Sequence, residues 1–285
     1  MKKYRILCIG CLVLMGIGAF SVRRWYSRQQ RLCPLHMMEK VDDTTREMME
    51  GPLPEQELMP ILSQPLFFLG KGKQSVAYET ADGRYVVKFF KNALKKSKQK
   101  KVRESIEGSF IALRHIPEQT ATIACSSGNT CSVLPAVTLL SKKGKVSRVH
   151  IQKEPFIVQK KAQPFKRTLM RLLAQGKKEE AERALLSLFD LLRSCQQKGV
   201  IDTDGSLIRK ENMGLLNGRA VLFDTGKLHL FSDIQRHRLH DLNRLKPLRS
   251  WLEEACPELL ETYRLAIVRA KKECRKNNKV IHVEK

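Results

Sequence analysis

Three short segments of this chain combine residue types that bind phosphate and metal ions. The first is a glycine-rich turn at residues 69–76 that leads into an apolar strand. The second is an apolar strand at residues 85–90 that contains one lysine, Lys88. The third is an apolar strand at residues 221–223 followed by Asp224. Their order predicts a site for a nucleoside triphosphate and its divalent cation, because backbone N–H groups and an ammonium bind phosphates and a carboxylate binds the metal.

The glycine-rich turn supplies the phosphate-binding part of this prediction. Gly70 and Gly72 let backbone N–H groups approach a phosphate without a Cβ in the way, and Val76 follows in the next strand. No Gly-Lys-Ser/Thr sequence opens a helix, so a Walker motif is absent. Taken alone, a plain hairpin turn explains the segment equally well.

Lys88 is expected to bind the phosphates. Strand alternation places Lys88 on the same face as Val86 and Phe90. The alternative is that Lys88 has no functional role and simply lies on a half-exposed strand. Residues 95–116 then read as an amphipathic helix that carries Glu107, and an ion pair between Glu107 and Lys88 would hold the ammonium against phosphate oxygens.

Oxygen-bearing side chains cluster in the sequence before and after the third segment. Asp224 and Asn212 are suited to a hard divalent cation. Asp204, eight residues before Asn212, is suited to orient or deprotonate an acceptor hydroxyl. The structural alternative is that Asp202, Asp204 and Gly205 simply form a turn.

The net charge of +24 favours anionic partners, which could be nucleic acid, lipid headgroups or acidic protein, and does not choose among them. We do not expect nucleic acid as a partner, because the sequence shows neither zinc-finger spacing nor an aromatic RNA-binding signature. Cys125 and Cys131 flank a turn-rich stretch and could pair under oxidising conditions, whereas a cytoplasmic domain would keep them reduced.

The N-terminus predicts a membrane segment. Residues 6–22 form an uncharged apolar run with basic residues on both sides and an aromatic pair, Trp25 and Tyr26, just after it. A cleavable signal peptide is the alternative, but the downstream arginines favour an uncleaved single-pass anchor. We expect the following domain to face the cytoplasm, or a host's cytosol if the protein is exported.

The whole chain divides into four parts by pattern. Residues 1–24 are the anchor and residues 25–60 a linker rich in methionine and proline. Residues 61–160 contain mainly strand patterns, and residues 161–285 mainly helical ones. Asn217-Gly218 predicts a tight hairpin within the last part.

Over residues 66–230 this arrangement resembles the protein-kinase-like superfamily. The resemblance assigns the nucleotide-binding, catalytic and metal-binding roles by motif. The matched positions are Gly70, Gly72 and Val76 of the glycine loop, Lys88 of the strand lysine, Glu107 of the helix glutamate, Asp204 of the catalytic loop, and Asn212 and Asp224 of the metal site. Residues 159–163 correspond to the hinge that contacts adenine.

The resemblance implies an α+β, two-lobed protein-kinase-like fold with an antiparallel-sheet N-lobe, residues 61–160, and a short, mainly helical C-lobe, residues 161–285. It also implies ATP and Mg²⁺ as cofactors. The chain departs from the family pattern in several places. Asp202 and Thr203 stand where the family has the His and Arg that precede its catalytic Asp. Seven residues separate Asp204 from Asn212, where the family has four, and Ala-Pro-Glu is absent after Asp224. The short C-lobe is similar to that of small-molecule or lipopolysaccharide kinases.

Three functions follow as alternatives. The first is a membrane-anchored, ATP-dependent phosphotransferase acting on a protein, sugar or lipid hydroxyl. The second is a pseudokinase that binds nucleotide or acts as a scaffold, favoured by the altered segment around Asp204. The third is a basic, membrane-tethered adaptor for anionic partners, favoured by the charge alone.

Overall fold

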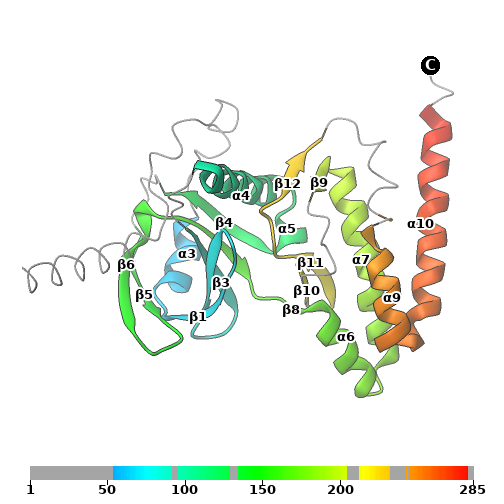
Figure 1. Cartoon of the computed structure of the whole chain (residues 1–285), viewed down its shortest axis with the longest axis horizontal. Coiled ribbons are helices and arrows are strands. Elements are labelled where there is room, and N and C mark those ends of the chain that lie inside the picture. Colours follow the sequence, from blue (N-terminus) through cyan, green and yellow to red (C-terminus); the bar gives the residue numbers. More distant parts are fainter. Residues whose placement is uncertain are drawn as a thin grey trace, which may run out of the picture.

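A computed structural model describes residues 54–91, 96–128, 134–203, 212–231, 242 and 244–281. The predicted membrane anchor and most of the predicted linker lie outside these residues, as do Asp204 and Cys131. No helix among the described residues combines the length and the apolar character needed to span a bilayer. The described chain is α+β, with a curled sheet half at residues 54–160 and a mainly helical half at residues 161–281 (Figure 1).

The sheet half contains seven strands in the order β4-β7-β3-β2-β1-β5-β6. Their bounds are β1 (Leu66–Lys71), β2 (Ser75–Thr80), β3 (Tyr85–Phe90), β4 (Thr122–Ser127), β5 (Ala136–Leu140), β6 (Val146–His150) and β7 (Pro155–Lys160). The prediction of an antiparallel sheet is wrong in one place, because β1 and β5 pair in parallel and the sheet is therefore mixed. The β5–β6 hairpin pairs with the edge of the sheet at β1. Strand alternation shows which residues share a face but does not determine which distant strand pairs with β1.

Helix α3 (Glu55–Leu62) covers one face of the curled sheet. Leu58, Ile61 and Leu62 are buried there against Val87 and Phe89 of β3. Residues 55–60 were expected to belong to the linker, but their apolar side chains at helical spacing give this face of the sheet its cover.

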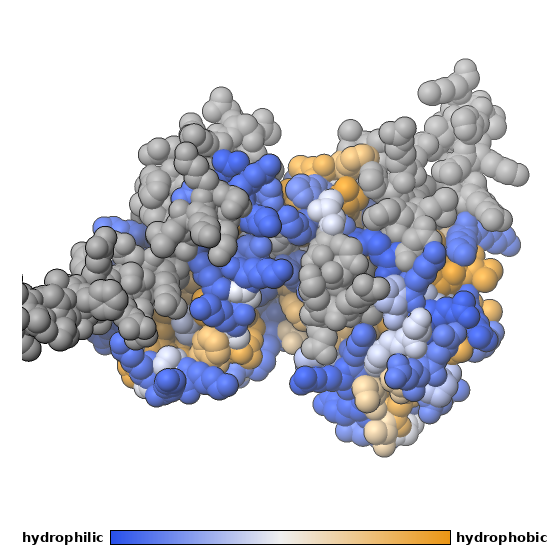
Figure 2. All heavy atoms as spheres, viewed as in Figure 1, coloured by the Kyte–Doolittle hydropathy of each residue, from blue (hydrophilic) through white to orange (hydrophobic). Residues whose placement is uncertain are grey.

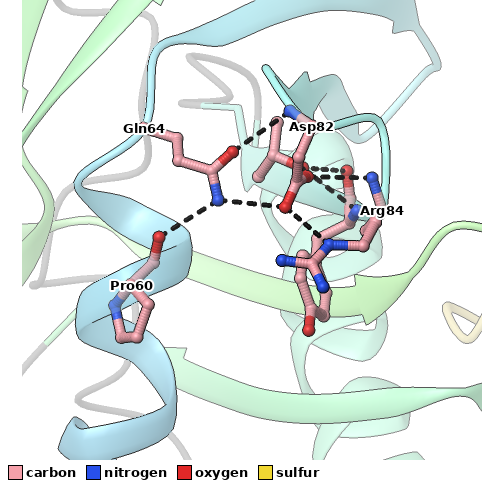
Figure 3. Close-up of polar contacts among 6 residues, drawn as sticks. Pro60, Gln64, Asp82 and Arg84 are labelled. Carbon is pink, nitrogen blue, oxygen red and sulfur yellow. Dashed lines mark hydrogen bonds and ion pairs between the residues drawn. The ribbon is translucent and has the colours of Figure 1, made fainter.

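The end of α3 is tied to the β2–β3 turn by a polar network (Figure 3). Gln64 Nε2 donates to the carbonyl of Pro60 at 3.1 Å and to Asp82 Oδ2 at 3.2 Å. Asp82 also accepts hydrogen bonds from Thr80 and Arg84, which hold the pKa of its carboxyl well below the usual range. This turn therefore satisfies its own polar groups.

Helix α4 (Lys96–His115) covers the opposite face of the sheet. Val102, Ile106 and Phe110 recur every four residues and pack on Phe90, Cys125 and Ile157, which confirms the amphipathic helix predicted for residues 95–116. Cys125 is a free, buried thiol whose pKa is raised by desolvation. Further along, Ile111, Ala112 and Ile116 belong to the core of the helical half, so α4 and its C-terminal end join the two halves.

The helical half is built on α6, α7, α9 and α10, with two small sheets at its junction with the first half (Figure 1). Its helices are α6 (Phe165–Ala174), α7 (Lys178–Gln197), α9 (Lys246–Ala255) and α10 (Leu260–Ile281), with the 3₁₀ turn η3 (Pro257–Leu259). The short helix α5 (Pro117–Thr120) and the 3₁₀ turn η2 (Ile151–Lys153) lie within the sheet half. The small sheets have the orders β11-β10-β8 and β12-β9. Their strands are β8 (Gln163–Pro164), β9 (Val200–Asp202), β10 (Met213–Leu216), β11 (Arg219–Leu222) and β12 (Leu228–Leu230).

The predicted Asn217-Gly218 hairpin is confirmed. It joins β10 to β11, and its two central residues have φ of 51° and 77°. Both values lie in the left-handed region that this kind of turn requires. Because Met213 pairs with Leu222, the hairpin brings Asn212 level with Phe223 at its open end.

Candidate functional site

Lys88 reaches from the sheet half to the segment that precedes Asp224. Its neighbours Val87 and Phe89 face the core under α3, while Phe90 faces α4, so the predicted face for Lys88 is confirmed. The Nζ atom donates a hydrogen bond to the carbonyl oxygen of Phe223 and lies 5.8 Å from the centroid of that residue's ring. A residue of β3 and the end of β11 are thereby brought together.

The environment of this ammonium changes its acidity. The side chain keeps partial access to solvent, but its ammonium lies deep among protein atoms. Burial lowers the pKa of Lys88 to about 8, and the nearby charge of Asp224 opposes this shift. Lys88 and Asp224 are therefore close enough to interact electrostatically, although the Lys88 ammonium donates its hydrogen bond to the carbonyl of Phe223.

Asn212 and Asp224 lie at the same end of the β10–β11 hairpin. The backbone N–H of Phe223 donates to the carbonyl oxygen of Asn212 at 3.1 Å, and Asn212 is buried. Asp224 is exposed, and its Oδ1 accepts a hydrogen bond from the N–H of Gly226 at 3.2 Å. The described residues include no group of three or more His, Cys, Asp or Glu side chains that could hold a metal ion. A cation at Asp224 would thus need further oxygens from phosphates or water, as Mg²⁺ commonly does.

The segment after Asp224 packs against α4 at backbone distance. A Cβ on Gly108 of α4 would lie 2.3 Å from the carbonyl oxygen of Thr225, and a Cβ on Gly226 would lie 2.9 Å from Ser105 Oγ. Ser105, Gly108 and Ser109 are spaced three and four apart and form a small-residue strip on one face of α4. Only a glycine at position 108 allows this approach.

A buried hydrogen bond fixes the same contact. Ser109 Oγ and Thr225 Oγ1 are 2.8 Å apart, and both residues are buried. The Ser109 hydroxyl also donates to the carbonyl of Ser105 at 2.8 Å, so its only hydrogen is used there. The Thr225 hydroxyl is therefore the donor to Ser109.

The expected ion pair between Lys88 and Glu107 is not formed in the part of the chain that the structure describes. Glu107 pairs with Arg103 at 3.5 Å, one turn earlier on α4. Glu104 instead reaches across to Lys227 at 2.9 Å, and this hydrogen bond lowers the pKa of its carboxyl. The small-residue strip packs against the segment after Asp224 and thereby fixes the rotation of α4 about its axis. Sequence periodicity predicts which residues share a face of α4, but it does not predict which segment that face contacts.

Gly70, Gly72 and Val76 lie in and beside the β1–β2 turn, as predicted. The N–H of Gly72 donates to the carbonyl of Ser75 at 3.0 Å, and Val76 pairs with Lys71 across the hairpin. A Cβ on Gly70 would meet no atom within 4 Å, and a Cβ on Gly72 would meet only Ser75 at 3.8 Å or more. Nothing in the described structure demands glycine at these two positions.

The predicted hinge, residues 159–163, leads from β7 into β8. Gln159 is buried and donates from Nε2 to the carbonyl of Thr120 at 2.9 Å. Gly214 of β10 lies so close to this connection that a Cβ there would be 2.7 Å from Ala162 and 3.0 Å from the ring of Phe223. The connection, the β10–β11 hairpin and Lys88 therefore meet around Phe223. The surface is indented between the two halves in this view (Figure 2).

Asp204 lies outside the described residues, whereas Asp202 lies within them. Arg244 donates to the backbone carbonyl of Asp202 at 2.6 Å and to its Oδ2 at 2.8 Å, and both side chains are buried. Asp202 thus has a structural partner. Sequence reasoning missed Arg244, because one arginine among many basic residues gives no local signal.

No protein-family model matches this chain, and a search of curated proteins gives no match either.

Proposed function

We propose that this chain is a two-lobed, protein-kinase-like phosphotransferase that uses ATP and Mg²⁺. The observation that carries the proposal is the contact between Lys88 Nζ and the carbonyl oxygen of Phe223, immediately before Asp224. It brings the one lysine of β3 to a carboxylate that is separated from it by more than 130 residues of chain. An ammonium and an exposed carboxylate that are close enough to interact electrostatically can bind the phosphates and the metal of one nucleotide.

The arrangement of elements supports the same proposal. Five strands, β4-β7-β3-β2-β1, are neighbours in that order, and the helix after the lysine strand packs on them. After the connection at residues 161–164, the hairpin β10–β11 carries Asn212 before it and Asp224 after it. The openness of Gly70 and Gly72 supports a ligand at the β1–β2 turn, because the fold itself does not require these glycines.

In the proposed reaction, this chain's residues position and neutralise charge. Lys88 would hold phosphate oxygens, and Asn212 and Asp224 would bind Mg²⁺, which supplies further charge neutralisation when bound. Asp204 would orient the acceptor hydroxyl of a protein, sugar or lipid. Glu107 would contribute only after exchanging its present partner, Arg103.

Turnover by the purified full chain tests this proposal. We expect Mg²⁺-dependent loss of the ATP γ-phosphate, abolished by Asp224→Ala and retained by Asp190→Ala, which removes an exposed carboxylate of α7. Equal turnover in the Asp224→Ala variant would contradict the metal assignment.

A pseudokinase is the second candidate, and one observation favours it. Asp202, which stands where the resemblance expects a histidine, is held in a buried ion pair with Arg244 and serves the fold. This candidate predicts stabilisation by ATP without turnover. At a hundredfold excess of ATP over its dissociation constant, the gain in unfolding free energy would be about 2.7 kcal/mol.

We also propose that residues 6–22 anchor the protein in a membrane with the phosphotransferase on the cytosolic side, since ATP is available there. The proposal rests on the sequence alone. Protease digestion of intact and permeabilised cells tests it. Degradation of the domain by external protease in intact cells would contradict the orientation.

A further inference from the structure

One residue at the end of β3 holds the β1–β2 turn. The ammonium of Lys91 donates to the carbonyl oxygen of Gly72 and lies 3.5 Å from that of Lys73. The backbone N–H of Lys91 donates to the carbonyl oxygen of Gln74 at 2.8 Å. Lys91 therefore binds three consecutive carbonyl groups of the turn.

The face from which Lys91 acts follows from strand alternation. Val87 and Phe89 face the core under α3, so Lys91 continues on that face, while Lys88 lies on the other. The carbonyls of Gly72 and Lys73, which both accept from the Lys91 ammonium, are thus drawn away from the Lys88 face. The peptide bonds of this turn, like all those between described residues, are trans, and a trans peptide directs its N–H opposite to its carbonyl. The N–H groups of Lys73 and Gln74 consequently point toward the Lys88 face.

These two N–H groups have no acceptor within the part of the chain that the structure describes. The N–H of Gly72, in contrast, is used to close the turn onto Ser75. Two successive N–H groups directed to one side form a small concave anion site. The exposed side chains of Lys71 and Lys73 add positive charge at the same turn.

We propose that Lys91 is a positioning residue that directs the N–H groups of Lys73 and Gln74 toward the terminal phosphates of a nucleoside triphosphate. This inference rests on the proposed function, which places the nucleotide on the Lys88 face. Lys91 does not touch the phosphates; it holds the carbonyls of the turn on the opposite face.

The β2–β3 turn provides a comparison, because its N–H groups are paired within the protein (Figure 3). In the β2–β3 turn, the N–H of Asp82 donates to Gln64 Oε1 at 3.1 Å and the N–H of Arg84 donates to Asp82 Oδ1 at 3.0 Å. The N–H of Gly83 donates to the carbonyl of Thr80 at 2.9 Å. That turn has its donors paired and a carboxylate at its centre, which would repel an anion.

Titration of the full chain with ATP and, separately, with adenosine tests the proposal. We expect Lys91→Met to weaken ATP binding about tenfold and to leave adenosine binding unchanged, because only the phosphates use the turn. Lys91→Arg should restore most of the ATP affinity, since a guanidinium can also donate to two carbonyls. Lys142→Met, which removes an exposed lysine from the β5–β6 turn, should match the wild type.

The outcomes separate this inference from the proposed function. A Lys91→Met variant that binds ATP as tightly as the wild type would overturn the inference alone. So would an equal loss of affinity for ATP and adenosine, because that pattern indicates general damage to the site. A wild-type chain that binds neither ligand would overturn the proposed function, and this inference with it.

Discussion

The two regions that meet at the proposed site use glycine for opposite reasons. In the β1–β2 turn, a Cβ on Gly70 or Gly72 would find open space. Between α4 and the segment after Asp224, a Cβ on Gly108 would lie 2.3 Å from a backbone oxygen. The fold therefore requires glycine at position 108 and does not require it at positions 70 and 72. Residue type alone therefore does not separate a structural glycine from one that leaves room for a ligand, whereas the surroundings do.

We call the β1–β2 turn the open region, and the contact between α4 and the segment after Asp224 the closed region. The largest expected effect comes from a substitution in the closed region. Gly108→Val should lower the unfolding free energy by about 3 kcal/mol, because the new side chain cannot fit between α4 and Thr225. Chemical denaturation of the full chain measures this change. Gly70→Val is the matched control in the open region and should stay within about 0.5 kcal/mol of the wild type. Similar losses of unfolding free energy in both variants would contradict the proposed difference between the two regions.

The next effect concerns the buried hydrogen bond in the closed region. Ser109→Ala should cost about 2 kcal/mol, because the Thr225 hydroxyl loses its acceptor in a buried position. Adding Thr225→Val should recover much of this loss, since neither side chain is then left with an unpaired polar group. A double-mutant cycle from denaturation curves measures the coupling. Strictly additive losses would show that the two hydroxyls do not interact.

The open region should respond in binding and not in stability. Gly72→Ala should leave the unfolding free energy unchanged, because its Cβ meets only Ser75 at 3.8 Å. It should weaken ATP binding about tenfold, because the added methyl hinders close approach of a phosphate to the turn. Calorimetric titration checks the affinity and denaturation checks the stability. Unchanged ATP affinity would mean that the turn does not contact the nucleotide.

A further expected effect depends on pH. The folded-state pKa of Lys88 is about 8, below the value of about 10.4 expected for an unfolded lysine. Between these values the unfolded chain binds more protons, so the Lys88 contribution makes stability rise with pH in this window. Lys88→Met should remove that part of the rise.

The same titration affects the nucleotide. ATP affinity should fall about fivefold between pH 8 and 9 as Lys88 loses its charge, and Lys88→Arg should flatten this dependence. Binding measured across the pH range checks both statements. A wild-type affinity that does not change above pH 8 would indicate that ATP does not use this ammonium.

Local pattern predicted much of the fold. Alternation placed Lys88 on the face opposite Val87, and apolar spacing located α4 within a few residues. The partners of these elements were harder to predict. The parallel pairing of β1 with β5 and the cover provided by α3 depend on contacts between distant segments, which residue order does not encode directly.

The site divides in the same way. Lys88, Asn212 and Asp224 could be nominated from residue type and position, and the structure brings them to one region. The partner of Glu107 could not be predicted, because periodicity gives the faces of α4 but not its rotation against Thr225. Lys91 and Arg244 gave no signal among 53 lysines and arginines, since their roles arise from backbone carbonyls that lie close only in the folded chain.

The most direct test of the central claim is the affinity of the full chain for ATP with and without Mg²⁺, in the wild type and in Asp224→Asn. The claim is that Lys88 and Asp224 hold one metal-bound nucleotide between the two halves. It predicts that Mg²⁺ tightens ATP binding in the wild type and has little effect in the variant. Equal affinities with and without Mg²⁺ in the wild type, or the same Mg²⁺ effect in both proteins, would contradict it.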